Sequence, residues 1–151
     1  MQSLLTLLRH AQDERDRCAA AWQWAHNAQL ALEAQYEQLL AFRHEYEARW
    51  SHQFSEQGQI ELVRSYHGFM QRLTQALDHQ QGTVKAAVTR AAKARVVLRE
   101  REVRVASVRK LLERREQQAS SDSHRREQKF NDEMASRVVH DSSVQGLAST
   151  F

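Results

Sequence analysis

Residues 83–112 read TVKAAVTRAAKARVVLREREVRVASVRKLL. Mostly apolar side chains recur in this stretch alternately three and four residues apart, at Val84, Ala87, Ala91, Ala94, Leu98, Arg101, Val105, Val108 and Leu112. This spacing averages about 3.5 residues, the period of the buried seam in a left-handed coiled coil. The stretch therefore predicts a long helix with one apolar stripe.

The stripe has a counterpart in the N-terminal third of the chain. Upstream of residue 83 it continues through Tyr66, Met70, Leu73, Leu77 and Gln80. The counterpart comprises Leu4, Leu8, Ala11, Arg15, Cys18, Trp22, Ala25, Gln29, Leu32, Tyr36, Leu39, Arg43, Tyr46 and Trp50. When the chain folds back at Gly58, each member of one stripe meets a member of the other, and their residue numbers sum to 116. The sequence predicts an all-α fold, a long two-helix antiparallel coiled-coil hairpin.

Composition and turn residues set the expected helix limits. The chain has no proline and only four glycines, and proline costs about 3 kcal/mol inside a helix. We expect one helix from Ser3, as its N-cap, to about His52. A second helix should begin near Ile60 and end at about Arg137. Glycines at positions 68 and 82 leave open whether residues 60–82 form a separate short helix.

The C-terminal part extends beyond the predicted hairpin. Met1 would lie beside residue 115, so the helix after Arg115 would overhang without an intramolecular partner, and the serine-rich residues 120–123 would weaken it. Isolated helices are only marginally stable, so we expect the overhang to become ordered on a partner. Residues 1–137 are predicted to form one coiled-coil domain, and residues 138–151 a disordered tail.

Charge is distributed unevenly along the chain. Residues 85–110 carry nine Lys or Arg and two Glu, whereas residues 1–50 carry five Arg and seven Asp or Glu. A solvated face, an acidic protein channel or nucleic acid could each account for the basic segment. The aromatic residues lie in or near the seam instead of alternating with arginines, which disfavours nucleic acid. Within the seam, Arg15 would face Arg101, a like-charge layer that Asp13, Asp16 and Glu102 could offset.

Catalytic and metal-binding patterns are missing from the sequence. The eight histidines lack zinc-ligand spacing, and glycine-rich phosphate loops are absent. Cys18 is expected to fill the seam, and carboxylates on a two-helix fold face water, where nothing tunes them as general acids. The chain has no apolar run long enough to span a membrane and no signal peptide. We therefore expect a cytoplasmic protein that is not an enzyme and needs no metal or cofactor.

Four segments carry a resemblance to a known family. They read QYEQLLAFRHEY at 35–46, SYHGFMQRLTQAL at 65–77, LLERR at 111–115 and EQKFNDEMASR at 127–137. In this order and spacing, the chain resembles the FliJ family of flagellar export proteins over residues 3–137. The resemblance implies a non-enzymatic component of the flagellar type III export apparatus, similar to the central stalk of rotary ATPases. It would lie in the cytoplasm, peripherally associated with the inner membrane at the flagellar base.

The resemblance also implies partners and contact residues. The implied partners are a hexameric export ATPase, the cytoplasmic domain of the export-gate membrane protein, and export chaperones, with no nucleic acid. Gate contacts would map onto Gln35, Leu39, Phe42, Tyr46, Phe69, Leu73, Ala76 and Gln80. These eight form opposing pairs whose numbers sum to 115, although the family often has His at the position of Gln80. ATPase contacts would map onto Arg114, Gln128, Lys129, Asp132 and Glu133.

Alternative interpretations stand beside these assignments. Leu39, Tyr46 and Leu73 also lie on the seam and could simply pack the hairpin, whereas Phe42, one position off the seam, is the better candidate for an exposed aromatic contact. The residues near the C-terminus could be a solvated face. Two other functions fit the same pattern: the stalk of a virulence type III secretion system, and a nucleic-acid-binding helical arm.

Overall fold

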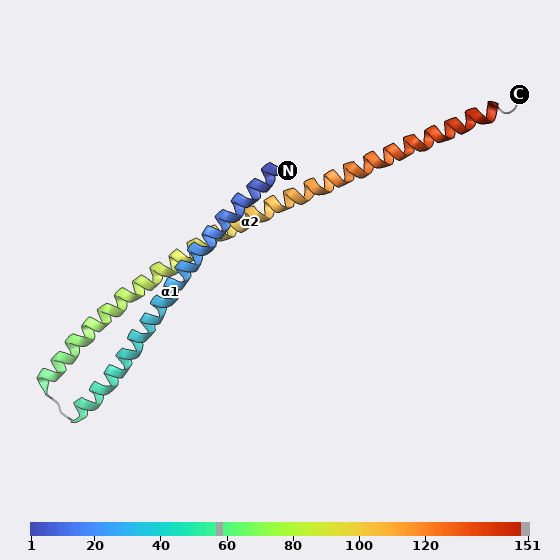
Figure 1. The fold of residues 1–151 in the computed structure, drawn as a ribbon. Coiled ribbons are helices and arrows are strands. Elements are labelled where there is room, and N and C mark those ends of the chain that lie inside the picture. The colour runs from blue at the N-terminus through green and yellow to red at the C-terminus, as the bar shows by residue number, and fades with distance from the viewer. Residues whose placement is uncertain (57–58, 149–151) are drawn as a thin grey trace. The chain divides into compact units, whose positions relative to one another are not determined.

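Two long helices make up the fold (Figure 1). In the computed structural model, residues 1–56 and 59–148 are described, and they contain α1 (Gln2–Glu56) and α2 (Ile60–Ala148) but no strand. The two helices pack against each other, which confirms the predicted helical hairpin. The predicted turn residue Gly58 lies outside the described residues.

The helix ends differ from the predicted ends by a few residues. α1 begins at Gln2, so Ser3 lies inside the first turn, and the predicted N-cap is wrong. The hydroxyl of Thr6 donates a hydrogen bond of 3.0 Å to the carbonyl of Gln2 in that turn. α1 ends at Glu56 rather than near His52, because nothing in the intervening residues interrupts a helix. α2 begins at Ile60, as predicted, with Glu61 in its first turn, where a carboxylate is favourable near the helix dipole.

α2 is one continuous helix from Ile60 to Ala148. Residues 60–82 are therefore not a separate short helix, and the serines at 120–123 do not interrupt the hydrogen-bonded backbone. The second helix was predicted to end near Arg137, but α2 continues to Ala148. The hydroxyls of Ser142 and Ser143 donate hydrogen bonds to carbonyls one turn earlier, at 2.8 and 2.7 Å, so these residues extend the helix instead of ending it.

The buried side chains all come from the two predicted stripes. Residues His10–Arg104 form one compact unit, and Met1–Arg9 form another with the chain from Val105 onward. In the first unit the buried apolar residues are Ala11, Ala25, Leu73, Leu77, Ala87, Ala91 and Leu98. In the second they are Leu4, Val105, Val108 and Leu112. Every one of these described residues stands on the predicted seam, so the spacing argument is confirmed at the level of single positions.

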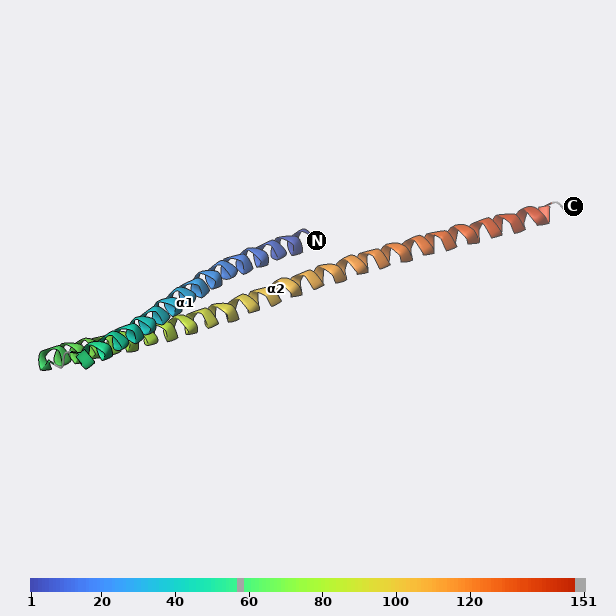
Figure 2. The same cartoon turned by 90° about the horizontal axis from the view of Figure 1, so that it is seen from below.

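Contacts between α1 and α2 inside the unit His10–Arg104 give the register. Trp50 packs on Tyr66 with ring centroids 5.7 Å apart, a pair whose numbers sum to 116. The amide of Gln80 donates to the side chain of Gln35 at 3.3 Å, a pair that sums to 115. Figures 1 and 2 show the parts of α1 and α2 in this unit running in opposite directions. The alignment about residue 58 is therefore correct to about one residue for these pairs.

In the predicted like-charge layer, Arg15 and Arg101 each lie close to a carboxylate. Arg15 donates to the carboxylate of Asp16 from Nε and Nη2, at 3.0 and 2.9 Å. Arg101 instead lies 3.8 Å from Glu14, a residue that the sequence argument did not name. Glu14 Oε2 and Arg101 Nε are buried and have no hydrogen-bond partner among the described residues. The layer is thus neutralised, but its hydrogen bonding is incomplete.

Candidate functional site

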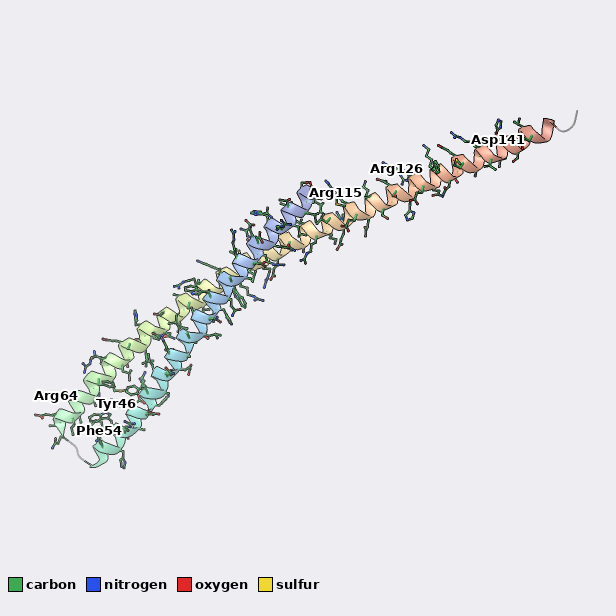
Figure 3. All side chains as sticks on the ribbon, in the orientation of Figure 1. Tyr46, Phe54, Arg64, Arg115, Arg126 and Asp141 are labelled. Atoms are coloured by element: carbon green, nitrogen blue, oxygen red, sulfur yellow. The ribbon has the colours of Figure 1, made fainter. Side chains whose placement is uncertain are left out.

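Aromatic side chains gather near the Glu56 end of α1 and the Ile60 end of α2. We call these residues the aromatic cluster: Phe42, Tyr46, Trp50 and Phe54 of α1 with Tyr66 and Phe69 of α2. The four members in α1 are four residues apart, so they share one face of the helix. In Figure 3 the rings of Tyr46 and Phe54 lie between the two helices.

The rings of the aromatic cluster contact one another across the helix pair. Tyr46 and Phe69 have centroids 4.2 Å apart, and Phe54 meets Tyr66 edge-on at 5.2 Å. Phe42 meets Phe69 edge-on at 6.3 Å and stacks on Tyr46 at 5.9 Å. Such pairs contribute about 0.5–1.5 kcal/mol each beyond the area they bury. The cluster therefore holds this part of the helix pair together.

Phe42 is the exposed member of the aromatic cluster. Its side chain is 46% exposed, whereas the other five rings are half-buried. Two neighbouring rings fix its position, so little conformational entropy would be lost when a partner covers it. A large, rigid and exposed aromatic side chain is the kind of residue that anchors protein interfaces.

The C-terminal part of α2 is a second exposed surface. Among the residues whose burial the structure describes, which end at Gly146, Leu112 is the last buried one, and all residues from Glu113 to Gly146 are exposed. Figure 3 labels Arg115, Arg126 and Asp141 along this segment of α2. The exposed segment includes Phe130, 63% exposed, and Met134, 47% exposed. We call residues 113–146 the exposed C-terminal helix.

Comparison with known proteins identifies the family. The model of the family described as Flagellar FliJ protein matches residues 1–143. The chain belongs to the FliJ family. It is therefore a protein associated with flagellar type III export, and the resemblance predicted over residues 3–137 is confirmed. No curated protein and no solved structure matches the chain significantly.

The structure brings together several of the eight gate residues that the FliJ resemblance implies. Tyr46 contacts Phe69, and Gln35 bonds to Gln80, so two of the four predicted opposing pairs are in direct contact. Gln80 also donates to the carbonyl of Leu32 at 3.4 Å. Glutamine thus joins the two helices at a position where the family often has histidine.

Burial divides the eight residues onto which the gate contacts would map. The exposed ones are Gln35, Phe42 and Ala76, and the half-buried ones are Leu39, Tyr46, Phe69 and Gln80. Leu73 is only 7% exposed, so it packs inside the helix pair and has little surface to offer a partner. Accessible contact area therefore centres on Phe42 and its polar neighbours.

The five implied ATPase residues all lie on or beside the exposed C-terminal helix. Arg114, Gln128, Lys129, Asp132 and Glu133 are exposed. Gln128 and Asp132 are four apart, as are Lys129 and Glu133, so the last four share one broad face. Sequence reasoning did not single out the exposed apolar residues Phe130, Met134 and Val138, although their spacing of four was visible in the sequence.

The structure shows no pattern for metal chemistry or for crossing a membrane in the residues it describes. Within residues 1–56 and 59–148, no group of three His, Cys, Asp or Glu side chains could hold a metal ion. Neither α1 nor α2 has a stretch that is apolar enough to span a membrane. Cys18 is half-buried and forms no disulfide.

Proposed function

We propose that this FliJ-family chain acts as a non-enzymatic, central-stalk-like coiled coil of flagellar export. It binds the ring of the hexameric export ATPase, links the ring to the cytoplasmic domain of the export-gate membrane protein, and escorts export chaperones. It works in the cytoplasm, peripherally associated with the inner membrane at the flagellar base. The observation that carries this proposal is the exposed C-terminal helix in a chain whose family serves flagellar export.

Exposure and charge support ATPase binding by the exposed C-terminal helix. From Glu113 to Gly146 this segment buries no side chain, and it holds acidic and basic residues in similar numbers. A polar socket made of several subunits can pair both signs of charge, whereas a phosphate backbone cannot. Exposed Phe130 and Met134 add apolar area that a socket would cover.

Geometry supports gate binding by the aromatic cluster. Phe42 is exposed and fixed by Tyr46 and Phe69, and Gln35 and Gln80 lie joined nearby. This combination gives an apolar anchor beside polar groups, as in the centre and rim of many interfaces. Leu73 and Tyr46 then act mainly by holding the two helices in register.

Binding of the full-length chain to the purified export ATPase tests the proposal directly. Reversal of both charges at Asp132→Arg and Glu133→Arg should weaken binding by roughly tenfold or more, because two acidic contacts become repulsive. Asp141→Arg is the matched control on the same exposed helix and should bind normally. Equal binding by all three proteins would contradict the assigned ATPase surface.

Gate binding needs its own comparison. Phe42→Ala should weaken binding to the cytoplasmic domain of the gate protein by roughly tenfold, as expected for loss of an aromatic anchor. Leu30→Ala is the matched control, because Leu30 is a similarly exposed residue of α1, at 49% against 46%. If Leu30→Ala weakened binding as much as Phe42→Ala, the aromatic cluster would not be the contact.

A further inference from the structure

A second apolar stripe runs along α2, outside the seam. Val88, Ala92 and Val96 are exposed, and the two valines are 40% and 56% exposed. They are spaced four apart, so they form a line along the helix, next to the buried seam residues Ala87 and Ala91. We call Val88, Ala92 and Val96 the outer stripe. It lies within the unit His10–Arg104 and shares no residue with the gate or ATPase surfaces.

The outer stripe forms one wall of a shallow groove between α1 and α2. Trp22, His26 and Gln29 of α1 line the same groove as Val88, Ala91 and Ala92 of α2. Trp22 and His26 stack with centroids 5.1 Å apart, and the guanidinium of Arg95 lies 4.8 Å above the Trp22 ring. Farther along α2, a second shallow hollow on α2 alone is lined by Val96, Arg99, Glu100 and Val103. Residues 88–103 span about 22 Å of helix, or about four turns.

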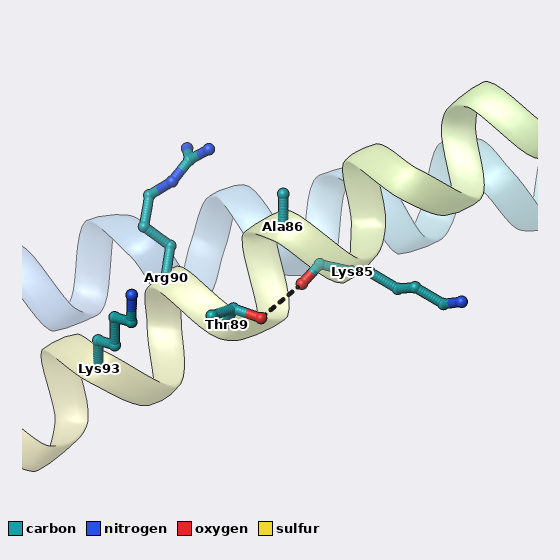
Figure 4. Close-up of a pocket in the computed structure, with 5 residues that line it drawn as sticks. All are labelled: Lys85, Ala86, Thr89, Arg90 and Lys93. Carbon is teal, nitrogen blue, oxygen red and sulfur yellow. Dashed lines mark hydrogen bonds between the residues drawn. The ribbon is translucent and has the colours of Figure 1, made fainter.

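Positive charge borders this groove. Lys93 and Arg99 lie beside the valines, and Arg95 lies over Trp22. Figure 4 shows Lys85, Arg90 and Lys93 projecting from α2 around Thr89, whose hydroxyl bonds to the carbonyl of Lys85 at 3.0 Å. Glu100 is the acidic residue in the lining. Lys85, Lys93 and Arg99 form no ion pair with any residue that the structure describes.

The shape and the charge together indicate one kind of occupant. A stripe of four-residue spacing beside a groove between two helices fits a third helix, which would turn the pair into a three-stranded packing. A second copy that packed through the same stripe would bring another basic segment, since residues 85–110 carry nine Lys or Arg against two Glu. The occupant therefore has to supply carboxylates on both sides of its apolar seam.

We propose that the groove beside the outer stripe binds an acidic amphipathic helix of a partner protein. The apolar seam of that helix covers Val88, Ala92 and Val96. Its flanking Asp or Glu side chains meet Lys93 and Arg99 on α2. This interaction goes beyond the proposed function and uses none of the residues assigned to the gate or the ATPase, so either proposal can fail without the other.

The test uses the full-length chain and a designed peptide probe. The probe is a fluorescent helix of about four to five turns with Leu at the seam and Glu at the flanking positions. A scrambled peptide of equal composition and a peptide with Lys in place of Glu are the comparison probes. Only the acidic amphipathic peptide should bind, and its dissociation constant should rise with salt, because the flanking contacts are charged.

Two matched variants locate the binding. Val96→Glu should weaken binding of the acidic peptide by roughly tenfold, because it places a like charge on the covered stripe. Val144→Glu, at a valine of nearly equal exposure, 54% against 56%, should have no effect. Circular dichroism should show the same helix content in both variants, since both changes are on the surface.

Three outcomes would overturn the proposal. Equal binding of the scrambled peptide would show simple attraction between opposite charges. Equal weakening by Val144→Glu would show that the groove is not where the peptide binds. If DNA, RNA or anionic vesicles bound more tightly than the peptide and lost binding through Val96→Glu, the groove would serve one of those partners instead of a protein helix.

Discussion

Burial separates two large apolar residues, Leu77 on the predicted seam and Phe42 one position off it. Leu77 is 4% exposed, whereas Phe42 is 46% exposed. Leu77→Ala should lower the free energy of unfolding by about 2–5 kcal/mol, because it removes buried methyl groups and leaves a cavity. Phe42→Ala removes two ring contacts of about 0.5–1.5 kcal/mol each and leaves no enclosed cavity, so it should lower the free energy of unfolding by about 1–3 kcal/mol and by less than Leu77→Ala. Urea unfolding followed by circular dichroism measures both, and equal losses would place Phe42 in the core.

The layer of Arg15 and Arg101 gives a second prediction at the scale of single residues. Glu14 Oε2 and Arg101 Nε are buried without hydrogen-bond partners, so the ion pair between these residues is incompletely solvated. Replacing a partly buried ion pair by neutral groups of similar size is often neutral or stabilising. Because both side chains are about a third exposed, the double variant Glu14→Gln with Arg101→Met should leave the free energy of unfolding unchanged or raise it by at most about 1 kcal/mol.

The single variant Arg101→Met is the control for the double variant. Arg101→Met alone leaves the Glu14 carboxylate without its cation at 3.8 Å, so it should be less stable than the double variant. If the double variant were instead the least stable of the set in urea unfolding, the ion pair would contribute net stability.

At the scale of single residues, the sequence predicted which side chains are buried, because burial follows from the spacing along the helix. It did not predict which charged side chains pair, because pairing depends on how far each side chain extends. Each buried apolar residue could be predicted from the three-and-four spacing. The partner of Arg101 could not, because Glu14 and Glu102 both lie one position from a seam arginine and only the helix rotation brings Glu14 within reach. Exposure of Phe42 was expected from its place one position off the seam, and the structure confirms it.

At the scale of the helices, the sequence predicted that both segments are helical and how they align better than it predicted where each helix begins and ends. The seam spacing gave both helices and their alignment, since a shift by one residue would turn every seam residue away from its partner. The ends were less certain, because no proline or positive-φ residue marks them among the described residues. α2 passes through 82 and 120–123 because one glycine or a few serines cost less than breaking a long helix.

The register itself can be tested by cross-linking. Leu32 and Val84 are both half-buried, stand opposite each other in the predicted alignment, and lie next to the hydrogen bond from Gln80 to the carbonyl of Leu32. Cysteines at these two positions, in a Cys18→Ser background, should form a disulfide within one chain, since their Cα atoms should lie within the usual range of about 4.4–6.8 Å. Mobility on non-reducing gels and mass spectrometry measure the yield.

A pair shifted by one heptad serves as the control. Leu39→Cys with Val84→Cys should not cross-link, because seven residues of helix move one partner by about 10 Å along the axis. Efficient cross-linking of the shifted pair, with failure of the predicted pair, would show that the two helices align differently from the contacts of Trp50 with Tyr66 and Gln35 with Gln80.

At the scale of the whole molecule, the fold and the binding partners have to be inferred from different sources. The hairpin follows from the chain's own apolar spacing, because both halves of the packed interface are in the sequence. The partners do not, because a binding surface is complementary to a molecule that the sequence does not contain. Family membership supplies flagellar export, and the structure adds which candidate residues are exposed. The contact roles of Phe42 and Asp132 therefore remain proposals to be tested by binding.

Residues 113–146 provide the prediction that bears most on the stalk proposal. Every side chain in this segment is exposed, so no buried apolar contact stabilises the helix there. Truncation after Arg114 keeps every buried residue of the part of the chain that the structure describes, the last of which is Leu112. The truncated chain should therefore melt within about 2 °C of the full chain, since only surface residues are lost, while ATPase binding should disappear. A large drop in melting temperature would show that the segment packs on the rest of the molecule.

Hydrogen exchange gives the sharper measurement on the intact chain. An isolated helix in water opens often, because no tertiary packing offsets the entropy of ordering it. The amides of residues 129–136 should therefore exchange rapidly in the free protein, whereas those around Leu77 and Leu98, which are buried, should exchange slowly. Addition of the export ATPase should slow exchange at 129–136 and leave the buried region unchanged. Strong protection at 129–136 in the free protein would remove the reason for assigning this helix to a partner, since an already stable helix gains no order by entering the ATPase ring.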